Sequence, residues 1–212
     1  MITHSRPRLG VACLLVATLA VATAAAQQID PRLDRLDPTT RSTVGALVDS
    51  AGAAALPTEP LIQRALEGAT KRAKGDVIIA AVRHLAADLA NARTALGPSA
   101  SPGELAAGAA ALRAGASPTI LSELRRTRRE PLIVPLAVLT DLVASGVPVD
   151  SAATAVIALA KRARDADLVA FRRAVERDIA LGAPPVAATA AAATAALVDV
   201  NAGARQQRPG RP

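Results

Sequence analysis

Glycine and proline residues divide this chain into segments of about 10 to 20 residues, each dominated by Ala, Leu, Arg and Glu. Segments of this length and composition are typical of short helices, and the glycines and prolines between them predict tight corners. No stretch alternates β-branched residues with polar ones, and no Asn-Gly or Asp-Gly turn is present. The sequence therefore predicts an all-α fold, a compact array of about nine short helices stacked as helical hairpins.

Three polar residues, Asp37, Ser101 and Ser117, each stand directly before a proline. An aspartate or serine side chain accepts a hydrogen bond from the first turn of a helix, and proline is favoured at the first helical position. These residues therefore predict three helix starts, the first of which opens a helix that runs to about Ala51. Glu104 follows Ser101 by three residues, which predicts a capping box at that start.

Three glycines, Gly115, Gly146 and Gly182, each follow a helical run and precede a proline by at most three residues. Glycine adopts the left-handed backbone conformation that often ends a helix, and the apolar residue after it can fold back onto the last turn. Each of these glycines therefore predicts a corner between two helices.

The first 26 residues have the order of regions found in a secretory signal peptide. Arg6 and Arg8 form a basic start, Leu9–Ala22 is an almost unbroken apolar run, and small residues follow it. We expect cleavage after Ala26, with Ala24 as the second choice. The protein is therefore predicted to be exported, either to the periplasm or into the medium.

An uncleaved membrane anchor is the alternative interpretation of this leader, because an apolar run of about 18 residues approaches the length that spans a bilayer. After cleavage we expect no transmembrane segment. Cys13 is the only cysteine of the chain and lies inside the leader, so the mature protein is predicted to have neither disulfides nor thiolate chemistry.

An internal similarity at an offset of 71 residues predicts that a four-helix unit has been duplicated. Residues 59–62 and residues 130–133 both read Glu-Pro-Leu-Ile, and Gly75 and Gly146 are separated by the same offset. The predicted parts of the chain are a leader over 1–26, a loosely ordered arm over 27–36, a single helical domain over 37–200 and a disordered basic tail over 201–212. Within the domain we predict a first helix over 37–52 and two repeat units over 57–128 and 129–200.

The core must be built from aliphatic side chains, because Phe171 is the only aromatic residue. Flat rings are the usual stacking surfaces for bases, so a nucleic-acid partner is not expected. The formal net charge is +7, and loss of Arg6 and Arg8 with the leader would leave +5. That excess favours either solubility alone or attraction to an anionic surface.

The apolar residues of three predicted helices lie on one face of each helix and are expected to form the core. They are Val77, Ile78, Val82, Leu85 and Leu89 in one helix, Leu136, Leu139, Leu142 and Val143 in a second, and Val156, Ile157 and Leu159 in a third.

His84 and Asp88 are the one pair with the spacing of an oriented general base, four residues apart on a predicted helix. The neighbouring Arg83 favours the other interpretation, an ion cluster that faces solvent. Zinc is bound mainly by cysteine and histidine side chains, and the predicted mature chain has one histidine and no cysteine. We therefore predict neither a metal site nor a cofactor.

Arg125, Arg126, Arg128 and Arg129 form the densest local charge and lie where the two predicted units join. Cations near the end of a helix are favoured by the helix dipole, which is sufficient reason for their presence. As a binding site, the same four residues are our candidate contact for an anionic partner.

The predicted function is that of an exported, non-enzymatic helical scaffold or interaction protein of a bacterial-type cell envelope, which binds another envelope protein through a helical surface. Two alternatives remain open. One is a hydrolase with a carboxylate site between the two halves. The other is a binder of anionic lipid or polymer that uses the arginine-rich joint.

Overall fold

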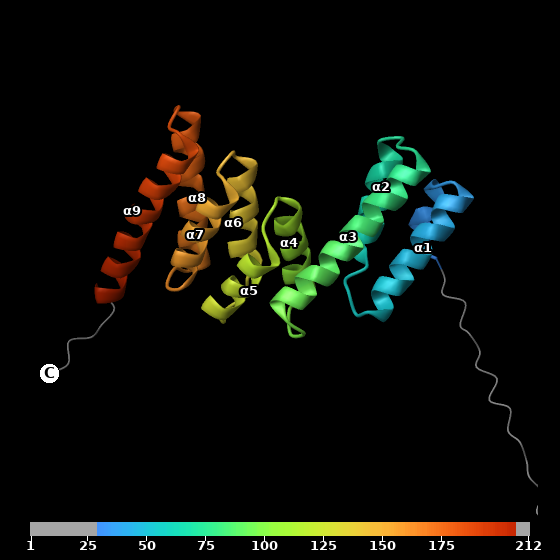
Figure 1. Ribbon diagram of the computed structural model, residues 1–212, viewed down its shortest axis with the longest axis horizontal. Coiled ribbons are helices and arrows are strands. Elements are labelled where there is room, and N and C mark those ends of the chain that lie inside the picture. Colours follow the sequence, from blue (N-terminus) through green and yellow to red (C-terminus); the bar gives the residue numbers. More distant parts are fainter. Residues whose placement is uncertain (1–28, 207–212) are drawn as a thin grey trace, which may run out of the picture.

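The computed structural model describes residues 29–206, with side chains up to residue 202, and this part of the chain is all-helical as predicted. Figure 1 shows the helices standing side by side in a row that follows the order of the sequence. The elements are a 3-10 helix η1 (Pro31–Arg35) and the helices α1 (Pro38–Ala53), α2 (Glu59–Thr70), α3 (Gly75–Leu96), α4 (Pro102–Arg113), α5 (Pro118–Thr127), α6 (Ile133–Ala144), α7 (Val149–Ala160), α8 (Asp165–Ala180) and α9 (Pro185–Gln206).

Each helix packs on its immediate neighbours in the sequence or on the helix after the next one. The odd-numbered helices α1, α3, α5, α7 and α9 contact one another in succession, and α4, α6 and α8 form a second layer in the same way. This pattern is that of a short α-solenoid, in which hairpins share their apolar faces with the hairpins before and after them. The predicted stack of helical hairpins is therefore confirmed.

The three predicted helix starts are confirmed by their capping hydrogen bonds. The N–H of Thr40 donates to Asp37 Oδ1 over 3.0 Å, and the N–H of Ile120 donates to Ser117 Oγ over 3.3 Å. At the start of α4 the side chains of Ser101 and Glu104 form the predicted capping box. Each bond satisfies a backbone N–H that a helix would otherwise leave without a partner.

The predicted corner glycines also take the expected conformation, with φ of 104° at Gly115, 89° at Gly146 and 96° at Gly182. At the first of them the N–H of Ala116 donates to the carbonyl of Ala111 over 3.0 Å, which is the long hydrogen bond of a Schellman motif. Two helices of the stack are thus joined by a few residues at each of these corners.

The core is aliphatic except for Phe171, and it extends along the whole row instead of gathering at one centre. The prediction that Val77 is buried is wrong, because its side chain is 54% exposed. Val77 lies in the first turn of α3, beside the buried Ile78. Val143 is only partly buried. The other predicted core residues are buried, and the largest fully buried side chains are Phe171, Leu33, Leu61, Leu89, Leu96, Leu105, Leu121, Leu124, Leu132, Leu136, Leu139 and Leu142.

The predicted loose arm over 27–36 is corrected by the structure for the residues that it describes. Asp30 caps the short helix η1, which places Leu33 and Leu36 against the core. Of the predicted tail over 201–212, residues 201–206 belong to α9, which continues to Gln206, and for the remaining residues the tail stays a prediction. The leader over 1–26 and residues 207–212 lie outside the described residues.

The predicted duplication is not confirmed and stays a prediction. Glu59 is the first residue of α2, whereas Glu130 lies three residues before α6 begins, and α3 has 22 residues where α7 has 12. Gly75 has a steric reason of its own to be glycine. A Cβ atom there would lie 2.1 Å from Thr40 Oγ1, so this residue allows α3 to approach the start of α1.

Candidate functional site

The four arginines of the predicted anion site separate into two pairs. Arg126 and Arg129 are exposed, whereas Arg125 is partly buried and Arg128 is buried. The inward pair binds acidic and main-chain groups of neighbouring helices, and the outward pair remains at the surface. The structure thus gives two of the predicted residues a structural role and leaves two accessible to a partner.

Arg125 forms an ion pair with Glu104, which is itself only 5% exposed. The same carboxylate accepts hydrogen bonds from the N–H groups of Ser101, over 2.8 Å, and Leu132, over 3.0 Å. Burial alone would raise the pKa of Glu104, but the hydrogen bonds from Ser101, Leu132 and Arg125 outweigh it and lower the pKa to about 2. Glu104 is therefore an ionised joint that fastens the start of α4 to the end of α5 and to the segment before α6.

Arg128 lies at the end of α5 and joins two helix corners. Its Nη1 donates to the carbonyl oxygen of Ala163 over 3.0 Å, and its Nη2 donates to Asp165 Oδ1 over 2.6 Å. Arg128 therefore holds the α5–α6 corner against the α7–α8 corner. Sequence reasoning missed both partners because they lie 35 and 37 residues further along the chain.

Both of the corners that Arg128 joins carry exposed cations, and we call this set of cations the basic edge. Arg162 donates to Asn201 Oδ1 of α9 over 3.3 Å, and Arg164 pairs with Asp167. Glu130 and Asp165 are the exposed acidic residues of the same two corners. The residues of the basic edge are Arg126, Arg129, Lys161, Arg162 and Arg164, all exposed.

A groove of about 980 Å³ runs between α8 and α9 and begins at Arg162 and Arg164. Phe171 and a series of alanines from both helices form its apolar wall. Its polar lining consists of Arg162, Arg164, Arg177, Asp167, Asp178, Asp199 and Asn201.

The carboxylates of this groove are not arranged as an acid and base pair. Asp167 binds Arg164, Asp178 binds Arg177, and Asp199 is exposed. Glu104 is the only buried carboxylate within residues 29–202, and its hydrogen-bonding capacity is already taken by the joint described above. The hydrolase alternative therefore gains no candidate site from the described side chains.

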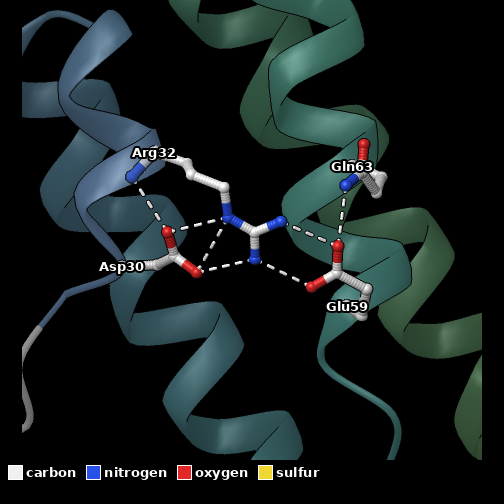
Figure 2. Close-up of polar contacts among 4 residues, drawn as sticks. All are labelled: Asp30, Arg32, Glu59 and Gln63. Carbon is white, nitrogen blue, oxygen red and sulfur yellow. Dashed lines mark hydrogen bonds and ion pairs between the residues drawn. The ribbon is translucent and has the colours of Figure 1, made fainter.

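The N-terminal end of the stack is held by a second ionic network, shown in Figure 2. The guanidinium of Arg32 donates to both carboxylate oxygens of Glu59 over 2.8 Å and also binds Asp30, while Gln63 donates to Glu59 over 2.7 Å. The hydrogen bonds from Arg32 and then Gln63 lower the pKa of Glu59 to about 2. This network fastens η1 to the start of α2, and sequence reasoning missed it because Arg32 and Glu59 are 27 residues apart.

His84 is exposed and Asp88 is half-buried, and no hydrogen bond joins them among the contacts of residues 29–202. In the same residues, no three His, Cys, Asp or Glu side chains come together in the way a metal site requires. The structure thus leaves His84 at the surface, where the solvent-facing interpretation had placed it.

Within the described chain, α9 is long and apolar enough over Pro185–Ala202 to cross a membrane by length and composition alone, and 11% of that stretch is buried.

No known protein family, no curated protein and no solved structure matches this chain.

Proposed function

We propose that this chain is an exported, non-enzymatic helical scaffold that attaches to the anionic lipid surface of a cell envelope through its basic edge. The observation that carries the proposal is that Arg128 joins two separate helix corners, each of which carries exposed cations. The leader over residues 1–26 supports export, because its regions follow the order of a signal peptide.

The geometry of the basic edge favours an extended surface over a small anion. Arg126, Arg129 and Lys161 project from two corners and do not line the groove between α8 and α9, at whose rim Arg162 and Arg164 lie. A flat array of phosphate headgroups can meet such dispersed cations together, whereas a single small anion could meet only one or two of them. Each Lys or Arg near an anionic bilayer contributes about 1 kcal/mol, so a few of them suffice for weak, reversible attachment.

The rigid joint beneath the basic edge also supports this assignment. Because Arg128 is 5% exposed and bound at both Nη atoms, the two corners keep a fixed spacing. Cations that are already held together lose less conformational freedom on binding than cations on independent loops.

Binding of the full chain to lipid vesicles tests the proposal. The measurement is the ratio of partition coefficients for phosphatidylglycerol-containing vesicles and for phosphatidylcholine vesicles, at low and at high salt. We expect the wild-type chain to prefer anionic vesicles, and the preference to fall as salt screens the charges. The variant R126E/R129E/K161E should lose at least about tenfold of this ratio, because three attractive contacts become repulsive.

A matched control reverses three exposed cations elsewhere, as in R35E/K74E/R83E. It changes the net charge by the same amount, and the leader is common to all variants. An equal loss in both triple variants would mean that only net charge matters, and an unchanged ratio in R126E/R129E/K161E would mean that the edge does not bind lipid. Either result overturns the proposal. So would binding to a soluble acidic polymer without any preference for anionic vesicles.

A further inference from the structure

The groove between α8 and α9 occupies the position that the next helix of the stack would take. Each interior helix from α3 to α7 is covered on both sides along the row, as α6 is by α4 and α8. The last pair of helices, α8 and α9, packs on α6 and α7 on one side only. Figure 1 shows the pair at the end of the row. A helix that continued the pattern would pack on both α8 and α9 and would lie in this groove.

In the described part of the chain, the N-terminal end of the stack, unlike the α8–α9 end, is covered by an additional element. There η1 packs on α1 and α2, buries Leu33 completely and is held by Arg32 through the network of Figure 2. Solenoids need such terminal caps, because an end without one exposes the apolar face that the next repeat would cover. Within the described residues, the α8–α9 end has no comparable element.

The α8–α9 end is apolar enough to need a cover. Six large apolar side chains of the described structure are exposed, and three of them, Leu181, Val186 and Val198, lie on α9 or on the corner before it. Their exposed fractions are 80%, 51% and 62%. None of these three lines the groove itself, in which Ala191 and Ala195 are exposed and are small enough to let another helix approach closely.

The charges of the groove identify the partner. Its rim carries three arginines and three aspartates, so it is neither acidic nor basic as a whole. An acidic or a basic peptide would meet like charges on part of this rim. A two-fold contact between identical surfaces requires a patch that is complementary to itself, and a rim that carries both signs of charge is compatible with such a contact.

We propose that the α8–α9 end binds the α8–α9 end of a second copy of this chain, so that each copy caps the stack of the other. Arg162 and Arg164 belong both to the basic edge and to the groove, whereas Arg126, Arg129 and Lys161 lie outside the groove. Variants of these last three residues therefore test lipid binding without altering the groove.

Sedimentation equilibrium of the full chain over a range of protein concentrations tests the dimer. We expect the wild-type chain to form a dimer at micromolar concentration. A191E/A195E should remain monomeric, because two carboxylates would enter the apolar wall of each groove. The matched control A87E/A90E places the same two substitutions on exposed residues of α3 and should dimerise like the wild type. A wild-type chain that stays monomeric, or an A191E/A195E chain that still dimerises, would overturn the inference.

A cross-linking measurement keeps the test valid if A191E/A195E fails to fold. The only cysteine of the chain is removed with C13S, and A195C or A87C is then introduced. We expect oxidation to link two copies of the A195C chain and to leave A87C monomeric. Equal cross-linking of the two variants would contradict a specific α8–α9 contact. R126E/R129E/K161E should still dimerise, so the two proposals can fail separately.

Discussion

Arg128 and Ala163 form a hydrogen bond of 3.0 Å that joins two helix corners 35 residues apart in the sequence. The arginine donates and the main-chain carbonyl accepts, and Asp165 balances the buried guanidinium from the same corner. The neighbouring Arg126 and Arg129 point to solvent. One short arginine run thus contributes both to the stability of the stack and to its surface charge.

Replacement of Arg128 should separate these two contributions. We expect R128A to lower the free energy of unfolding by about 2 kcal/mol, since it leaves the Ala163 carbonyl without its donor and removes a buried side chain. R128K should recover only part of this loss, because an ammonium group lacks the planar fork that reaches both partners. R126A should change stability by less than about 0.5 kcal/mol. Urea unfolding measures all three, and equal effects of R128A and R126A would contradict the structural assignment.

The stability of the fold should depend on the ionisation of Glu104. Its pKa is about 2 in the folded chain, below the usual value of 4.5, so the ionised carboxylate stabilises the fold at every pH above about 4.5. This contribution is lost as the pH falls from about 4.5 towards 2. At about 1.4 kcal/mol per pKa unit it amounts to about 3 kcal/mol.

The variant E104Q should therefore be less stable than the wild type at pH 5, and the difference should shrink by about this amount at pH 2. The other carboxylates titrate in both proteins and cancel in the comparison. A difference in unfolding free energy that stays constant over this range would show that the Glu104 joint does not hold α4, α5 and the segment before α6 together.

Glycine at position 75 should be required for close packing of α1 and α3. We expect G75A to destabilise the protein by about 1 to 3 kcal/mol, because the new Cβ would lie 2.1 Å from the hydroxyl of the buried Thr40. Gly52 provides the control, since a Cβ there would make only an ordinary contact of 3.5 Å with Thr58. G52A should therefore be neutral or stabilising, because alanine favours a helix over glycine. Thermal unfolding of the two variants gives the comparison.

Arg32 should control the order of the N-terminal cap without setting the stability of the whole fold. We expect R32A to speed amide hydrogen exchange at Leu33 and Leu36, whose N–H groups are bonded within η1, and to leave exchange in α3 unchanged. The loss of Arg32 removes the ion pair with Glu59 that fastens η1 to α2. R35A, on an exposed arginine of the same element, should leave these rates unaltered. Similar exchange in both variants would mean that apolar packing alone holds η1.

The features of this fold that depend on neighbouring residues could be predicted from the sequence. The caps at Asp37, Ser101 and Ser117 and the left-handed Gly115 are decided within one helical turn, and their chemistry is visible in a few consecutive letters. The ion pair of Arg125 with Glu104 spans 21 residues, so no local pattern could indicate it.

One prediction was wrong for a related reason, and another stays unconfirmed. The arm before α1 has few apolar residues, yet Leu33 and Leu36 find a buried place because α1 and α2 are adjacent to it in space. The similarity of the two Glu-Pro-Leu-Ile segments suggested equivalent positions, but the first segment opens a helix and the second precedes one. The two identical tetrapeptides thus differ in secondary structure, because their surroundings in the stack differ.

Each helix packs on the helices that are near it in the sequence. This has a consequence for how the chain folds. Folding does not have to wait for distant parts of the polypeptide to meet, and a topology with such local contacts is expected to fold rapidly. Each hairpin can dock as soon as the hairpins next to it in the sequence have formed.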